Sequence, residues 1–171
     1  AFALDFHFIL EQKGRNFGKH FINFNGTAGI WRKECILDAG NWSGDTLTED
    51  LDLSYRAQMK NWKFKFLGNV ETPAELPVVL SAARSQQFRW NKGGAENFRK
   101  TVWSVIKAKN IPFRTKFHGV MHLLNSSMFL CVFLVALLSI PSLYIKNTYG
   151  HLDWVFSLLS LFAISTIILF I

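Results

Sequence analysis

The chain has 171 residues, of which half are hydrophobic and 17 are Phe, and its formal net charge is +7. The apolar residues concentrate after about residue 120, which excludes an ordinary single soluble domain. The charge does not indicate a nucleic-acid partner, because residues 84–116 hold nine Lys or Arg residues and one acid, Glu96, directly before the apolar part.

The opening segment, residues 1–15, has helical periodicity. Ala3, Leu4, Phe8 and Ile9 fall on one face, with the charged residues outside it. The segment has neither a basic leader nor a cleavage signal, so it is not a signal peptide. We therefore expect it to be the middle of a helix, and the chain to be an internal piece of a larger membrane protein whose chemistry needs partners upstream.

Two short segments read as strands. Residues 21–31, FINFNGTAGIW, form an apolar run that ends in a glycine-rich bend, which is typical of a buried strand leading into a loop. In residues 62–70, Trp62, Phe64 and Phe66 alternate with lysines, which predicts a second strand. With helical sequence between them, the order strand, helix, helix, strand is an α/β pattern.

Two helices are predicted between these strands. Residues 32–40 form a short helix, with Gly40 in the position of a left-handed C-terminal cap. Residues 41–62 are predicted to be a loop followed by the second helix, and Thr46 and Glu49 have the spacing of a capping box. Its predicted apolar stripe consists of Leu51, Tyr55, Met59 and Trp62.

A long helical region begins near residue 80. Gln86, Arg89 and Trp90 are three and four residues apart, so a helix gathers them on one face. An amide, a forked cation and a flat ring together suit a polar ligand. An exposed helix with an Arg and a half-buried Trp accounts for the same residues equally well.

The same region continues toward the membrane. Gly93 and Gly94 are expected to interrupt the helix. Beyond them, an apolar stripe with basic residues elsewhere on the surface predicts a helix lying in the membrane interface. The stripe consists of Phe98, Val102, Val105 and Ile106.

Two apolar stretches follow, residues 120–145 and residues 154–171. The first has 26 residues, which at about 1.5 Å each exceed the roughly 30 Å hydrocarbon core. The second has 18 residues and is expected to be a truncated span. The positive-inside rule then places residues 1–116 in the cytoplasm, with the plasma (inner) membrane as the expected location, and the loop between the spans outside. The basic segment is also expected to contact anionic membrane lipids.

Two further stretches carry candidate chemistry. In TLTEDLDL, residues 46–53, Glu49 and Asp52 are explained as acids at a helix N-terminus. Asp50 lies at the junction of loop and helix, where a carboxylate can serve as a general base. The glycines of FNGTAG, residues 24–29, permit close approach of the backbone to a ligand, or form a structural turn.

Taken in order, FNGTAG, TEDLDL with SYRAQ after it, and QQFRW resemble the second half of a family 2 inverting glycosyltransferase of the processive, membrane-embedded kind. That kind includes cellulose, chitin and hyaluronan synthases. The text around the last motif, ELPVVLSAARSQQFRWNKGGAENFRK, is similar to that of mannan, glucomannan and related cellulose-synthase-like enzymes. The resemblance covers about residues 1–115. A TED triplet alone would be weak, but three motifs in the family's order before apolar spans are specific.

The resemblance implies roles for the matching residues. Asp50 would take the proton from the acceptor hydroxyl in a single inverting displacement, with Thr48 and Glu49 supporting it. Arg89, with Gln86, would hold the donor diphosphate through a bidentate contact that Lys could not reproduce.

The acceptor sugar would meet Trp90, whose ring packs against its C–H face, and Asn25, Gly26 and Thr27. The resemblance also implies a Rossmann-like α/β domain of the GT-A type. The expected divisions are residues 1–79 for the C-terminal half of the cytoplasmic catalytic domain, 80–117 for interfacial helices with the QxxRW motif, and the two spans at 120–145 and 154–171.

The family's Asp-x-Asp motif, which binds a divalent cation, has no counterpart in these residues. The ligands of Mg²⁺ or Mn²⁺ are therefore expected upstream, with none in this chain, and the chain alone is expected to be inactive. Cys35 and Cys131 are far apart, and the five histidines have no ligand spacing, so neither a disulfide framework nor a His-bound metal is predicted.

The expected function is transfer of a hexose from a UDP- or GDP-sugar to a growing β-linked polysaccharide at the cytoplasmic face of a membrane, with a glycan or glycolipid as acceptor. One alternative is a non-processive family 2 enzyme that adds one sugar to a lipid. Another is a non-catalytic membrane transport subunit, which needs ionisable residues in its spans. His122 is the single candidate for that role.

Overall fold

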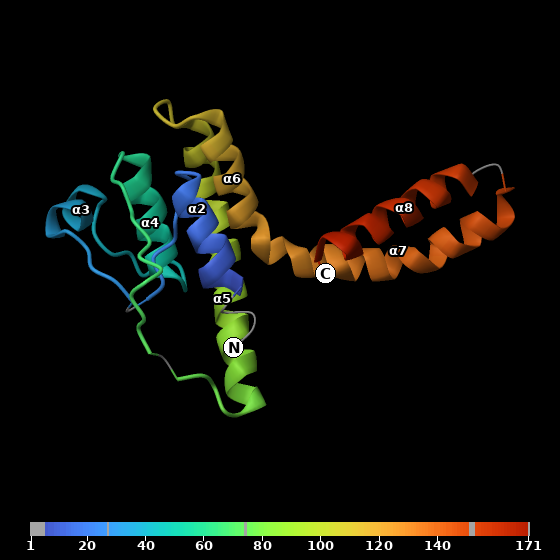
Figure 1. Cartoon of the computed structure of the whole chain (residues 1–171), viewed down its shortest axis with the longest axis horizontal. Coiled ribbons are helices and arrows are strands. Elements are labelled where there is room, and N and C mark those ends of the chain that lie inside the picture. The colour runs from blue at the N-terminus through green and yellow to red at the C-terminus, as the bar shows by residue number, and fades with distance from the viewer. Residues whose placement is uncertain (1–5, 27, 74, 151–152, 171) are drawn as a thin grey trace. The chain divides into compact units, whose positions relative to one another are not determined.

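The computed structural model describes residues 6–26, 28–73, 75–150 and 153–170. It divides into two compact units, Ala1–Ser127 and Met128–Ile171. The described elements of the first unit are a π-helical turn η1 (Phe6–Gln12), α2 (Lys13–Phe17), α3 (Lys33–Asp38), α4 (Glu49–Met59), α5 (Leu80–Lys107), α6 (Phe113–Leu123) and a 3-10 turn η2 (Leu124–Ser127) (Figure 1). The second unit contains α7 (Met128–Thr148) and α8 (Asp153–Phe170).

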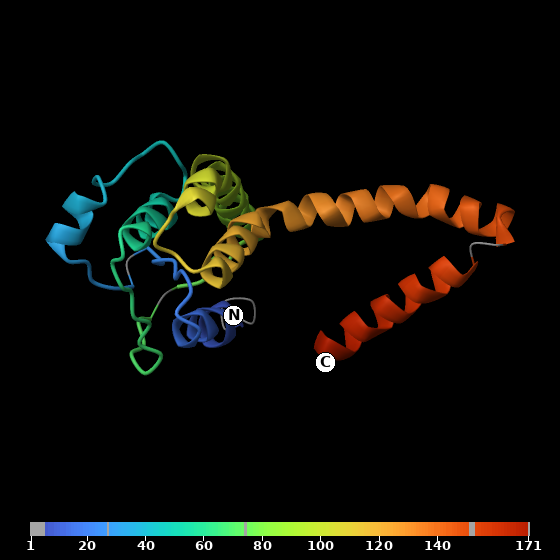
Figure 2. The same cartoon turned by 90° about the horizontal axis from the view of Figure 1, so that it is seen from above.

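Helix α4 is the central element of the first unit and is buried on two sides. Leu51 and Tyr55 join a core cluster with residues of α5 and α6, whereas Leu53 and Ala57 face a second cluster formed with α3. Figure 2 shows α4 between α3 and α5, in agreement with the contacts of both pairs. A helix fixed from both sides is a rigid support for residues at its N-terminus.

Neither predicted strand forms. The described residues contain no β-strand, so they do not confirm the α/β fold class. Residues 21–25 form neither helix nor strand and Gly26 lies in a turn. Their backbone groups bond to helix side chains instead: the Ile22 N–H to Gln58 Oε1 and the Phe24 N–H to Ser54 Oγ, both at 2.9 Å. The predicted alternation over residues 62–66 is present as alternating half-buried and exposed side chains, without a neighbouring strand.

The capping box at Thr46 and Glu49 is also wrong. Helix α4 starts at Glu49 with Thr48 as its N-cap residue, and no side chain caps it. The two threonine hydroxyls instead accept hydrogen bonds from Asn97 of α5, at 3.4 Å for Thr46 and 2.9 Å for Thr48. By contrast, α3 and the positive φ of +88° at Gly40 confirm the predicted short helix and its left-handed end.

Helix α5 begins at Leu80 as predicted, but Gly93 and Gly94 do not interrupt it. A Cβ atom at Gly93 would lie 2.6 Å from Thr48 Oγ1. The glycine therefore permits close packing of two elements, rather than a break in the helix.

The predicted apolar stripe of α5 faces the protein over most of its length. Val102 and Val105 are buried, and Phe98 packs against the same core cluster. Only Ile106 of the stripe is clearly exposed, at 45%. The expectation that this whole face meets lipid is therefore corrected, because the core of the unit occupies it.

In the apolar part, the helical run Phe113–Thr148 is long and apolar enough to cross a membrane by length and composition, and it covers the predicted span at 120–145. Pro141 lies inside α7. The second predicted span corresponds to α8, whose side chains from residue 162 onward lie outside the described set.

Candidate active site

Asp50 lies in the first turn of α4 and is held by two backbone N–H groups. Leu51 N–H donates to Oδ1 at 2.8 Å, and Gly26 N–H donates to Oδ2 at 2.9 Å. Gly26 has a φ of +61°, a left-handed conformation that glycine adopts without a steric penalty. The FNGTAG loop and the TED triplet, 24 residues apart in sequence, thus meet at one carboxylate.

The electrostatics of Asp50 favour a base. Burial raises its pKa, the two amide hydrogen bonds partly offset this effect, and the neighbouring charge of Glu49 raises the pKa further. A carboxylate with a raised pKa binds a proton more strongly than an exposed one. Each oxygen accepts one hydrogen bond and keeps a free acceptor position, so the group can still take a proton.

The loop beside Asp50 is backed by a polar cluster. Asn25 Oδ1 accepts a hydrogen bond from Asn23 Nδ2 at 3.1 Å and lies 3.4 Å from His7 Nε2. The buried Gln12 donates to the Asn23 carbonyl at 3.0 Å. Thr27, the third residue predicted to face the acceptor, lies outside the described residues.

His7 also contacts Glu11, whose carboxylate pairs with it at 2.8 Å and with Arg15 at 2.6 Å. Burial alone would raise the pKa of Glu11, but the hydrogen bond from His7 and the charge of Arg15 outweigh it and lower the pKa to about 2. Glu11 is therefore ionised at neutral pH and orients the His7 ring beside the loop.

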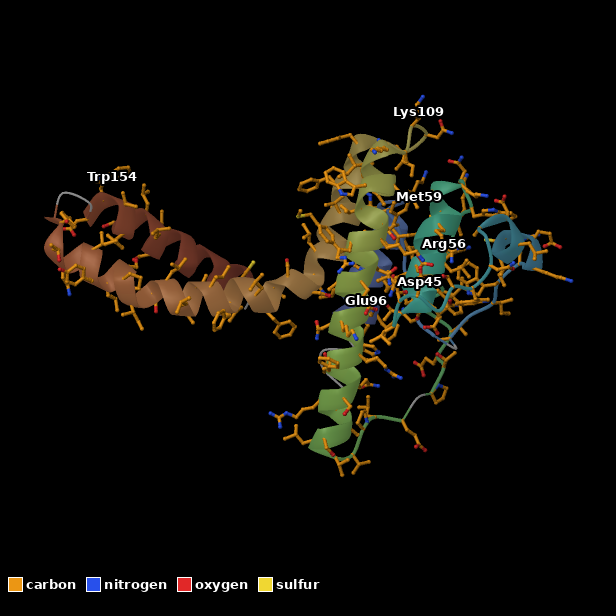
Figure 3. The ribbon with its side chains drawn as sticks, turned by 180° about the vertical axis from the view of Figure 1, so that it is seen from behind. Asp45, Arg56, Met59, Glu96, Lys109 and Trp154 are labelled. Carbon is orange, nitrogen blue, oxygen red and sulfur yellow. The ribbon has the colours of Figure 1, made fainter. Side chains whose placement is uncertain are left out.

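Helix α5 holds the start of α4 from the other side. The amide nitrogen of the fully buried Asn97 donates to the carbonyl of Thr48 at 3.0 Å, in addition to its hydroxyl. Glu96 accepts the Leu47 N–H at 2.9 Å. Figure 3 shows Glu96 on α5 near Asp45, which lies in the loop before α4. Residues 46–48, which lead into α4 and Asp50, are thus each hydrogen-bonded to α5.

Asp52 has a structural role in this contact. It is fully buried and forms ion pairs with Arg56 of α4 at 2.7 Å and with Lys100 of α5 at 3.0 Å. Lys100 also reaches Asp45 at 2.8 Å. Glu49, by contrast, is exposed. Of the three acids at the start of α4, only Asp50 is half-buried with open acceptor positions.

Gln86, Arg89 and Trp90 lie on the N-terminal half of α5, and their side chains form no hydrogen bond or ion pair with the residues that the structure describes. Gln86 is half-buried, Arg89 is exposed and Trp90 is 39% exposed. At about 100° per residue, Gln86 and Trp90 lie in line with Gly93 and Asn97. The predicted ligand face therefore continues, one turn later, into the contact with Thr48.

The sequence reasoning missed the roles of Gly93 and Asn97. Helical spacing could have found them, because both continue the face of Gln86 at i+7 and i+11. Helical spacing places Asn97 on this face, but it does not reveal that the side chain bonds to Thr48, 49 residues away.

No group of three or more His, Cys, Asp or Glu side chains in the described part of the chain is arranged to hold a metal ion. These residues therefore do not by themselves fit a Mg²⁺ or Mn²⁺ site.

Residues 2–171 match the sequence family described as Glycosyl transferase family group 2. The chain is 38% identical to glucomannan 4-beta-mannosyltransferase 9 of Arabidopsis thaliana over 155 residues, which are 85% of this chain and 29% of that protein. It is 42% identical over 116 residues to the probable glucomannan 4-beta-mannosyltransferase 2 of Oryza sativa subsp. japonica, covering 68% of this chain and 20% of that protein. The chain thus spans between a fifth and three tenths of the length of these relatives. No solved structure matches it.

Proposed function

The chain belongs to glycosyl transferase family group 2, and on that premise we propose that it carries the base-bearing, acceptor-side half of the active site of an inverting hexosyltransferase. The observation that carries this proposal is the Asp50 carboxylate, half-buried at a helix start and bonded to the Gly26 N–H of the FNGTAG loop. A base and a glycine loop in contact suit a site where an acceptor hydroxyl must be deprotonated.

In the proposed reaction the acceptor oxygen attacks the anomeric carbon of the donor sugar. As the new C–O bond forms, the proton of the hydroxyl passes to Asp50 and the bond from the anomeric carbon to the diphosphate oxygen breaks. The nucleoside diphosphate leaves with the bonding electron pair. One displacement inverts the anomeric centre, so a single base is sufficient.

The open face of α5 would complete the site. Arg89 would bind the leaving diphosphate with its planar fork, assisted by Gln86, and would stabilise the charge that develops there. Trp90 would offer its exposed ring to the acceptor sugar, beside Asn25, Gly26 and Thr27. The common helical face of Gln86, Trp90 and Gly93 supports this arrangement, because it directs these positions toward the start of α4.

The relatives are named as glucomannan 4-beta-mannosyltransferases. For the present chain we propose that the donor is a mannosyl nucleotide, that the acceptor is a β-linked glycan, and that sugars are added repeatedly to the same chain. The helical run Phe113–Thr148 and the basic residues 84–116 support an integral membrane protein whose catalytic part lies on the cytoplasmic side of the plasma membrane, near anionic lipid.

The test uses the full-length protein in membranes, supplied with GDP- and UDP-hexoses and a β-1,4-mannan oligosaccharide as primer. The expected product is a long β-linked chain made from a mannosyl donor. Addition of a single sugar to lipid, with no extension of the primer, would contradict the proposed processive polysaccharide synthesis. Absence of transfer from every donor, with donor binding intact, would contradict the enzymatic proposal.

A further inference from the structure

Three polar side chains on one face of α4 bond to the segment of residues 22–26 beside it. Asp50, Ser54 and Gln58 are four residues apart, and they accept the N–H groups of Gly26, Phe24 and Ile22 respectively, each at 2.9 Å. As the helix advances by four residues, the segment retreats by two. A ladder of side chains thus replaces the neighbouring strand that residues 21–26 would otherwise need.

The geometry of the two elements explains why this ladder stays in step. Four residues of α-helix advance about 6 Å, and two residues of extended chain advance about 6.6 Å. Over the three contacts, the advances of the helix and of the segment therefore differ by much less than the length of one residue. A slip of the segment by one residue would instead bring the wrong backbone groups opposite the helix and reverse its side chains.

The contact of Gln58 with Ile22 is buried and that of Ser54 with Phe24 is partly buried, and both side chains also donate a hydrogen bond. Ser54 also donates to the Asp50 carbonyl at 2.6 Å, and Gln58 donates to the Ile22 carbonyl at 2.7 Å. Ser54 is fully buried and Gln58 nearly so. Loss of either side chain would leave a buried or partly buried backbone N–H of the segment without its partner, which is unfavourable.

We propose that Ser54 and Gln58 are positioning residues that set the register of the Asn25–Gly26 loop against Asp50. Both side chains are buried and bonded to backbone groups, so they would act through the loop and not by contact with the acceptor. They determine which backbone N–H meets the Asp50 carboxylate and therefore how the loop and the base face the acceptor hydroxyl together. This inference rests on the proposed function for its catalytic consequence, whereas the register itself does not depend on it.

The test compares Ser54→Ala and Gln58→Met in the full-length enzyme with Ser104→Ala, the same loss of a hydroxyl at an exposed position of α5. Hydrogen–deuterium exchange of the backbone amides in residues 21–28 reports the register. We expect exchange about fivefold faster in the first two variants, the factor that corresponds to one net hydrogen bond, and unchanged in the control.

Kinetics supply the readouts that a purely structural role would not change. We expect kcat/KM for the acceptor to fall about tenfold or more while donor affinity stays within twofold. Because the Gly26 N–H lowers the pKa of Asp50, loosening that bond in Ser54→Ala should move the acidic limb of kcat to higher pH. Ser54→Thr, which keeps the hydroxyl, should retain the wild-type limb.

If amide exchange in residues 21–28 of Ser54→Ala and Gln58→Met matches that of the Ser104→Ala control, Ser54 and Gln58 do not set the register. Faster exchange with unchanged acceptor kinetics and an unchanged acidic limb would overturn the positioning role. A poorly folded Gln58→Met is replaced by Gln58→Glu, which keeps the acceptor for the Ile22 N–H but loses the donor, and the same exchange and kinetic criteria apply. Failure of the proposed function is seen separately, as full transfer by Asp50→Asn.

Discussion

Gly93→Ala tests whether α5 fixes the start of α4. The added Cβ would lie 2.6 Å, 2.7 Å and 2.9 Å from Oγ1, Cγ2 and the backbone N of Thr48. Rotation of the Thr48 side chain cannot relieve all three contacts, because one is made by the backbone. The backbone that leads into Asp50 must therefore move.

The size of the effect follows from two opposing contributions. Overpacking at a tight contact destabilises a protein by about 1–3 kcal/mol. Replacing Gly by Ala inside a helix stabilises it by about 1 kcal/mol. The expected net result for Gly93→Ala is a loss of between roughly 0 and 2 kcal/mol in the free energy of unfolding, together with slower transfer.

Two matched glycines separate packing from helix propensity. At Gly14 of α2, no atom lies within 4 Å of an added Cβ, so Gly14→Ala should keep the propensity gain of about 1 kcal/mol. At Gly94, the nearest atom is the hydroxyl of Ser126, which can rotate away. Thermal unfolding of the solubilised full-length protein should rank Gly14→Ala highest, then Gly94→Ala, then Gly93→Ala. If Gly93→Ala raises Tm as much as Gly14→Ala and transfers at the wild-type rate, the contact with Thr48 does not position Asp50.

Three further predictions concern ligand binding, topology and pH. Arg89→Lys should weaken the affinity for the donor diphosphate by about tenfold because the planar fork is lost. Trp90→Ala should instead shorten the product, with nucleotide affinity little changed. If both variants lose Tm equally and keep normal kinetics, this face of α5 serves packing and not ligand binding. A Cys that replaces Asn147 should react with an impermeant thiol reagent added outside intact cells, whereas a Cys that replaces the exposed Ala95 should not. Labelling at position 95 and not at position 147 would contradict the proposed topology. Glu11, whose pKa of about 2 lies below the usual 4.5, contributes stability that is present above pH 4.5 and lost as the pH falls toward 2, so acid unfolding of Glu11→Gln should vary less over that range than that of the wild type.

The helices could be predicted from the sequence because their signals are local. The stripe at Leu51 and Tyr55 and the glycine at position 40 each depend on residues within one or two turns, and the structure confirms them. The position of Asp50 at the start of a helix followed from the same local pattern.

The remaining features depend on distant residues, which a local pattern does not reveal. Residues 21–26 have the composition of a strand, but their backbone partners are Ser54 and Gln58, 30 and 36 residues away. Thr46 has the spacing of a capping residue, yet its hydroxyl accepts a hydrogen bond from Asn97 instead. Likewise Gly93 and Gly94 of α5 allow close packing against other elements. Helix propensity alone cannot distinguish a glycine that permits close packing from one that ends a helix.

The central claim is that Asp50 is the base for glycosyl transfer, and the most direct measurement is the rate of Asp50→Asn in the full-length enzyme at saturating donor and acceptor. Asn has nearly the same size and cannot accept the proton, so we expect transfer to fall by about 10²–10⁴-fold, with donor affinity and Tm close to wild type. Glu49→Gln, at an exposed neighbour, should keep most of the activity. Asp50→Asn that transfers at the wild-type rate would contradict the claim.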